Sequence, residues 1–143
     1  MIRSVRVKEN RGQESPHSLI TVLMKKPLYG TILGGVLGIF DGLTALASAP
    51  ETAPQIMSIV LGSTFKGLLA GFLIGYFARK VKSLPLGIVF GLFVGFLLAA
   101  GVVWMNVASG QPGYYWQILL PGSLVGVIVG YATQRHAELV PQR

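Results

Sequence analysis

The sequence predicts an all-helical integral membrane protein with four transmembrane helices, and three observations support this fold class. First, 52% of the 143 residues are hydrophobic and only 12% are charged, which leaves too little polar surface to cover a soluble domain of this size. Second, four segments are apolar and long enough, at about 1.5 Å per residue, to cross a hydrocarbon core about 30 Å thick. Third, each segment carries regularly spaced glycines. The expected spans are residues 28–49, 55–78, 84–105 and 114–133.

The rest of the chain forms two tails around this membrane domain. Residues 1–26 are polar and basic, apart from a short apolar segment at 18–26. That segment is too short to span a bilayer, so we expect it to lie at the membrane interface. Residues 27–136 make up the four-helix domain, and residues 137–143 form a C-terminal tail. No cleavage site of small residues follows the N-terminal charges, so the first span is expected to stay as an anchor.

The basic residues gather on alternate connections between the spans. Six precede the first span, three lie between the second and third, and two follow the fourth, whereas Glu51 is the single charge in the other two connections. This positive-inside pattern predicts that both termini and the middle connection are cytoplasmic, in the plasma (inner) membrane. The net charge of +7 is then explained by topology and by anionic lipid headgroups on the cytoplasmic side. We therefore expect the bilayer as a partner, and no nucleic acid.

Glycines recur every fourth residue in all four spans, in the pattern of a glycine zipper. Residues four apart lie on one face of a helix, so each helix presents a strip without side chains. In lipid, such strips allow the backbones of two helices to approach closely, which predicts a tightly packed bundle. Use of the strips for helix sliding or a narrow pore is the alternative. The strips consist of Gly30, Gly34, Gly38 and Gly42; Gly67, Gly71 and Gly75; Gly87, Gly91 and Gly95; and Gly122, Gly126 and Gly130.

The two halves of the chain resemble each other in sequence. The segment 38–47 aligns with 91–100 at an offset of 53, and the segment 67–76 aligns with 122–131 at an offset of 55. This alignment predicts two tandem helical hairpins in a parallel repeat, related by an axis along the membrane normal. The alternative is that glycine-rich apolar segments align with one another without common origin.

Two ionisable residues, Asp41 and Lys66, lie deep inside the predicted spans. Each costs about 2.5 to 3.5 kcal/mol at the centre of a membrane helix, so unpaired burial is unfavourable. Counted from the turn between the first two spans, their depths differ by only about 3 Å. Side chains tilt toward the N-terminus of their own helix, which brings the two charged ends closer together. The aligned positions in the second hairpin, Val94 and Pro121, are uncharged.

Three interpretations of the two charges remain open. They form an ion pair that sets the register of the first two helices and adds little net stability; or they form a site for an ion, a proton or an anionic substrate; or Lys66 extends alone toward an interface. The hydroxyls of Thr44, Ser63 and Thr64 could support either of the first two arrangements. In helices, however, such groups more often bond to their own backbone.

The sequence lacks the motifs of common enzymes, so we do not expect an enzyme. It contains no phosphate-binding loop, no zinc-protease motif and no nucleophile elbow. It has no cysteine, and His17 and His136 are far from other candidate ligands, so no metal or cofactor is expected. Two functions remain: a small homo-oligomeric transporter or channel for an ion or small solute, with Asp41 and Lys66 at its site, or a structural or accessory subunit of a larger membrane complex.

Overall fold

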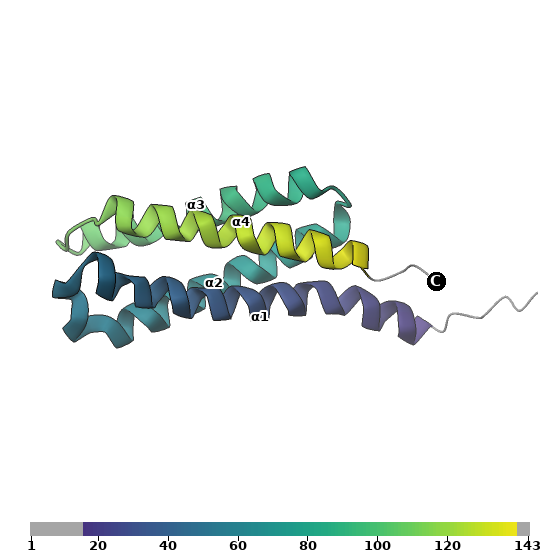
Figure 1. Cartoon of the computed structure of the whole chain (residues 1–143), viewed down its shortest axis with the longest axis horizontal. Helices are drawn as coiled ribbons and strands as arrows, with labels where there is room; N and C mark the ends of the chain where they lie inside the picture. The colour runs from purple at the N-terminus through teal and green to yellow at the C-terminus, as the bar shows by residue number, and fades with distance from the viewer. Residues whose placement is uncertain (1–15, 140–143) are drawn as a thin grey trace, which may run out of the picture.

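The computed structural model describes the backbone of residues 16–139 and the side chains of residues 26–135. Most of both predicted tails therefore lies outside the described residues, as do the side chains of His17 and His136. The described chain is helical (Figure 1), with turns and short connections between the helices. In order, the elements are α1 (Pro16–Ser48), the 3-10 helix η1 (Pro50–Gln55), α2 (Ile56–Lys80), α3 (Leu84–Ala108) and α4 (Tyr115–Leu139).

Within the described residues, four helical segments are long and apolar enough to cross a membrane. They are Lys26–Ser48, Pro50–Lys80, Leu84–Ala108 and Tyr115–Arg135. The prediction of an all-helical chain of the multi-pass membrane type is thus confirmed. The helix α1 starts earlier than the predicted span, because it passes through Pro27 without a break. The segment 18–26 is therefore the beginning of α1 and is continuous with the first span.

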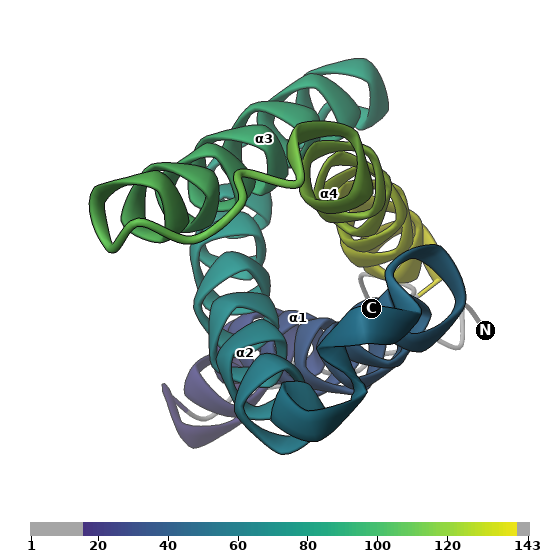
Figure 2. The same ribbon diagram turned by 90° about the vertical axis from the view of Figure 1, so that its left-hand side faces the viewer.

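The four helices surround a common axis as two antiparallel pairs (Figures 1 and 2). The helix α1 packs most extensively against α2, and α3 against α4. The described N-terminal end of α1, the α2–α3 connection and the end of α4 lie at one end of the bundle, which we call the connection end. The element η1 and the α3–α4 connection lie at the opposite end, which we call the η1 end (Figure 1).

Glycine backbones face each other at both helix crossings. In the first hairpin, a Cβ atom added to Gly34 would overlap the carbonyl oxygen of Gly67, and the reverse is also true. In the second hairpin, the same mutual overlap occurs between Gly91 and Gly126. Neither crossing can accept a side chain at these positions without moving the helix backbone.

These facing glycines define how the two hairpins correspond in space. When Gly34 is matched to Gly91 and Gly67 to Gly126, the residue at the position of Asp41 is Leu98, and the residue at the position of Lys66 is Val125. This register differs from the sequence alignment, which placed Val94 and Pro121 there. Leu98 and Val125 are partly buried hydrophobic residues that pack against the core.

The buried core lies in the middle of the bundle and toward the connection end. Its residues come from α2, α3 and α4, and α1 adds partly buried side chains around them. Near the α2–α3 connection, the rings of Phe77 and Phe90 stack with their centroids 3.9 Å apart. Large apolar side chains cover the outside of the helices, as lipid contact requires. The buried cluster consists of Ala70, Ile74, Val94 and Val129, with Leu33, Leu37, Phe90, Leu98 and Val125 packed against it.

Candidate functional site

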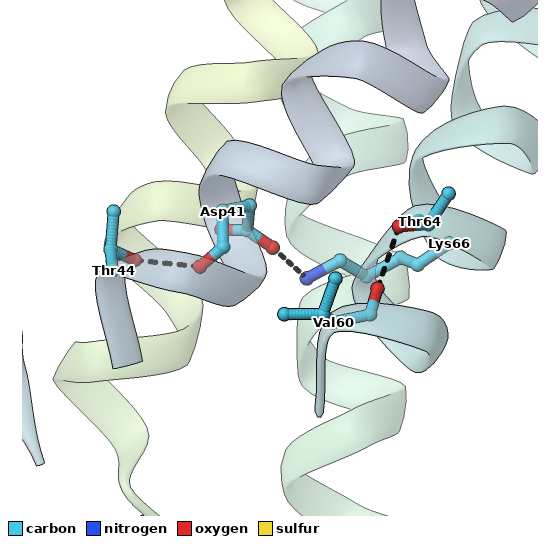
Figure 3. Close-up of polar contacts among 5 residues, drawn as sticks. All are labelled: Asp41, Thr44, Val60, Thr64 and Lys66. Carbon is cyan, nitrogen blue, oxygen red and sulfur yellow. Dashed lines mark hydrogen bonds and ion pairs between the residues drawn. The ribbon is translucent and has the colours of Figure 1, made fainter. Parts of the chain in front are cut away.

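The structure brings Asp41 and Lys66 together. The Lys66 Nζ atom donates to Asp41 Oδ2 over 2.7 Å, from α2 to α1 (Figure 3). The Lys66 side chain is 12% exposed and that of Asp41 is 5% exposed. Asp41 lies about 10 Å below the end of α1 at Ser48, at about 1.5 Å per residue. The ion pair therefore lies well inside the predicted hydrocarbon layer, in the half nearer to the η1 end.

The neighbouring glycines bring the two helices close enough for this contact. A Cβ atom on Gly42, the residue after Asp41, would lie 2.7 Å from the Cα atom of Val60 on α2. One turn earlier, a Cβ atom on Gly38 would lie 2.9 Å from the Cα atom of Thr64. Because the backbones are in contact here, the short aspartate side chain can reach the lysine ammonium group.

Lys66 also reaches the second hairpin. Its Nζ atom lies 3.6 Å from the place where a Cβ atom on Gly122 of α4 would stand. A side chain at position 122 would therefore contact the ammonium group directly. The ion pair is held within the first hairpin, but its positive end lies against α4. This proximity could not be predicted from the sequence, in which Gly122 is one of the regularly spaced glycines of its span.

The predicted supporting hydroxyls bond elsewhere or line a cavity. Thr44 donates to the backbone carbonyl of Asp41 over 2.6 Å, and Thr64 donates to the carbonyl of Val60 over 2.6 Å (Figure 3). Both hydroxyls thus donate to backbone carbonyls of their own helices, which is the more common arrangement for such groups. Ser63 lines the cavity described next.

A cavity of about 860 Å³ lies beside the ion pair, between the two hairpins. Asp41 and Lys66 form part of its wall, and its other walls extend to η1 and to the α3–α4 connection. The cavity thus joins the intramembrane charges to the η1 end of the bundle. Sequence reasoning missed most of its polar residues, although side chains such as Asn106 and Gln117 are unusual in apolar spans. The polar uncharged residues in its lining are Ser48, Thr52, Gln55, Ser58, Ser63, Asn106, Gln111, Tyr114 and Gln117.

The buried core separates this cavity from the connection end. Leu98 belongs to both regions, since it lines the cavity and packs against the core. Beyond it, Ile74 and Val129 are almost completely buried. The ion pair thus lies at the boundary between a partly polar cavity and an apolar barrier.

A hydrogen bond connects the two hairpins at the η1 end. The Tyr114 hydroxyl donates to Glu51 Oε1 over 3.2 Å, from the α3–α4 connection to η1. Desolvation is the main cause that raises the pKa of the Tyr114 phenol, and the hydrogen bond to Glu51 and its negative charge act in the same direction. Tyr114 also has a positive φ of 42°, a backbone conformation that is uncommon for residues with a side chain. Since Tyr114 lines the cavity, this contact lies at its entrance.

Aromatic rings and cations meet at the connection end. Lys80 Nζ lies 5.1 Å from the ring centroid of Tyr76, and the Arg79 guanidinium carbon lies 6.0 Å from it. On α4, the Arg135 guanidinium lies over Tyr131 and also donates to its hydroxyl. Basic side chains and tyrosine rings therefore occupy the same end of both hairpins.

Among the side chains that the structure describes, no three histidine, cysteine or acidic residues lie together. The fold and the site define a four-helix protein of the multi-pass membrane type, with an ion pair beside a cavity. No family model, no curated protein and no solved structure matches the chain.

Proposed function

We propose that this protein is a small transporter or channel for an ion or small solute, with Asp41 and Lys66 at its site. The observation that carries the proposal is the cavity of about 860 Å³ that joins the ion pair to the η1 end of the bundle. A pair that only set helix register would need no such access. Intramembrane charges beside a cavity are typical of substrate and ion pathways.

The second hairpin supports this reading of the charges. It makes an equivalent glycine crossing with Leu98 and Val125 where the first has Asp41 and Lys66. Buried ion pairs add little net stability compared with apolar residues of similar volume. Packing of the hairpin therefore does not require the charges, which favours a role in binding. The matching crossings also support our proposal that the hairpins arose as a tandem, parallel repeat with glycine-strip packing.

The cationic residues support an orientation with both termini in the cytoplasm. Arg79, Lys80 and Arg135 lie at the connection end with their tyrosine partners. Glu51 lies at the opposite end. By the positive-inside rule, we propose that the connection end faces the cytoplasm and that the membrane is the plasma (inner) membrane. In this orientation the cavity opens to the outside, and the apolar core closes the path from the cytoplasm.

A structural or accessory subunit is the second candidate function. It is favoured by the short Asp41–Lys66 contact, which suits a register device, and by the large apolar side chains on the outside of the bundle. Those surfaces could contact copies of this chain or a larger membrane complex as well as lipid. In this case the chain would carry no flux of its own.

Flux measurements in liposomes separate the two functions. The purified full-length protein would be compared with Asp41→Asn, Lys66→Met and the double variant Asp41→Leu/Lys66→Val, which reproduces the second hairpin. Ala47→Leu is the matched control, since Ala47 is exposed and lies outside the cavity lining. We expect flux of an ion or small solute in wild type and in the control, and its loss in the other three. Absence of flux in wild type would contradict transport. Full flux in a folded double variant would contradict the role of Asp41 and Lys66 in it.

A further inference from the structure

The lining of the cavity includes side chains on the outer surface of α2 and α3, and we call this part of its wall the side opening. Phe65 on α2 and Trp104 on α3 both line it, yet they are 70% and 75% exposed. The two helices are held together near their connection by the stacked rings of Phe77 and Phe90, and they diverge toward the η1 end (Figures 1 and 2). In a membrane, this opening faces the acyl chains. A lipid molecule beside α2 and α3 would therefore lie against this part of the cavity wall.

The floor of the cavity presents one positive and one negative charge side by side. The pair is neutral overall and nearly buried. A ligand with a single charge would attract one member and leave the other without its partner at a poorly hydrated position, which is costly. A ligand that carries both charges avoids this cost, because its cation can face Asp41 while its anion faces Lys66. The site therefore favours a zwitterion over an anion or a cation.

The walls differ in polarity between the floor and the side opening. Near the ion pair and the η1 end, Ser63, Asn106 and Gln117 offer hydrogen-bonding groups. At the side opening, Phe65 and Trp104 offer apolar surface. A volume of about 860 Å³ lies within the range of small-molecule sites. This division suits a molecule with a polar head and an apolar chain.

We propose that the cavity binds an amphiphile with a zwitterionic head, such as a phosphoethanolamine head, which enters sideways between α2 and α3. The ammonium group of the head pairs with Asp41 and its phosphate with Lys66, while the chain lies in the side opening. This inference rests on the proposed function, since it names the class of substrate for the same site.

Native mass spectrometry of the purified full-length protein tests the proposal. The probes are four single-chain lipids with the same acyl chain: lysophosphatidylethanolamine, anionic lysophosphatidic acid, a cationic acyl-chain amine and uncharged monoacylglycerol. We expect the zwitterionic probe to bind at least about tenfold more tightly than each of the others, which is about 1.4 kcal/mol. Equal binding of all four probes would overturn the proposal.

Variants assign the binding to this cavity. Asp41→Asn and Lys66→Met should each abolish the preference for the zwitterion, as should the double variant Asp41→Leu/Lys66→Val, which keeps the site packed. Gly101→Leu should weaken binding of all four lipids, because Gly101 lines the cavity and a Cβ atom there meets nothing within 4 Å. Ala47→Leu is the control and should bind like wild type. A preference that persists in the double variant would overturn the assignment.

Two further measurements test whether the ligand is a lipid or a soluble zwitterion, and whether binding is part of transport. Glycerophosphoethanolamine, which is the head group without the acyl chain, should not displace the bound lipid at equal concentration. If it displaces the lipid, the ligand is a soluble zwitterion and the proposal of an amphiphile is wrong. Selective lipid binding without any flux would overturn the transport function and leave this site standing. Flux without a preference among the four heads would overturn this inference alone.

Discussion

The two hairpins of this protein pack through the same kind of glycine crossing but carry different side chains beside it. Both cross through facing glycines, Gly34 with Gly67 and Gly91 with Gly126. At corresponding positions beside these crossings, the first hairpin carries the ion pair Asp41–Lys66, and the second carries apolar residues that join the core. The comparison teaches that the crossing needs glycine but does not need charge. The charges therefore require another explanation, and we propose that it is ligand binding in the adjacent cavity.

The largest expected loss of stability comes from placing a side chain at a glycine where two helices cross. Gly34→Val and Gly126→Val each place a side chain on a backbone carbonyl of the partner helix, and backbone cannot give way as a flexible side chain can. We expect each variant to lose about 3 kcal/mol or more of stability, measured by denaturant unfolding in detergent. Gly62→Val is the matched control, because its Cβ atom meets nothing within 4 Å. Equal losses at Gly34 and Gly62 would contradict the crossing geometry.

The next largest loss of stability is expected when one charge of the Asp41–Lys66 pair is removed. Asp41→Asn or Lys66→Met leaves the other charge without its partner, with an expected loss of about 3 kcal/mol. The double variant Asp41→Leu/Lys66→Val copies the second hairpin, so its stability should lie within about 1 kcal/mol of wild type. A double-mutant cycle in the same unfolding assay measures the coupling between the two residues. If the losses simply add, the two charges do not interact.

A smaller effect is expected at Gln134, which marks a further difference between the hairpins. Gln134 occupies the place that corresponds to Gly75 in the first hairpin, when Gly67 is matched to Gly126. Its side chain is buried, and its Nε2 atom donates to the carbonyl of Val81 over 2.9 Å. Gln134→Leu removes this bond to the α2–α3 connection and should cost about 1 to 2 kcal/mol. An unfolding midpoint unchanged from that of wild type would show that the bond does not hold the connection.

The smallest effect on stability is expected at the contact between the hairpins at the η1 end. Tyr114→Phe removes the hydrogen bond to Glu51, so the cavity entrance should open more often. Because the chain has no cysteine, a single Ser58→Cys in the cavity lining can be labelled without background. We expect faster labelling of this cysteine when Tyr114 is replaced by Phe. An equal rate would show that the contact does not restrict access.

The same contact should depend on pH in a defined direction. The pKa of Tyr114 is raised above its usual value of 10.0, so the folded state holds the phenol proton more tightly than the unfolded state. The stabilising contribution is complete below pH 10 and is lost as the pH rises through the raised pKa. Labelling of Ser58→Cys with a reagent whose rate does not vary in this range should therefore accelerate at high pH, and the Tyr114→Phe variant should lack this step.

Much of the fold could be predicted from the sequence, because the relevant signals are local. The length and apolar character of each segment predicted four membrane helices, and short connections require neighbouring helices to be antiparallel. The positions of Asp41 and Lys66 relative to one turn predicted depths that differ by only about 3 Å. An ion pair was one of three interpretations, because isolated charges are costly in hydrocarbon. None of these inferences needs knowledge of how the two hairpins meet.

The relation between the hairpins was decided only by the tertiary structure. A glycine strip repeats every turn, so a sequence alignment displaced by one turn scores nearly as well; the alignment matched Asp41 to Val94, whereas the facing glycines match it to Leu98. The proximity of Lys66 to Gly122 and the cavity beside it depend on the angle between two helix pairs, which is set by contacts far apart in the chain. Local periodicity determines which face of a helix packs, and three-dimensional packing decides what that face meets.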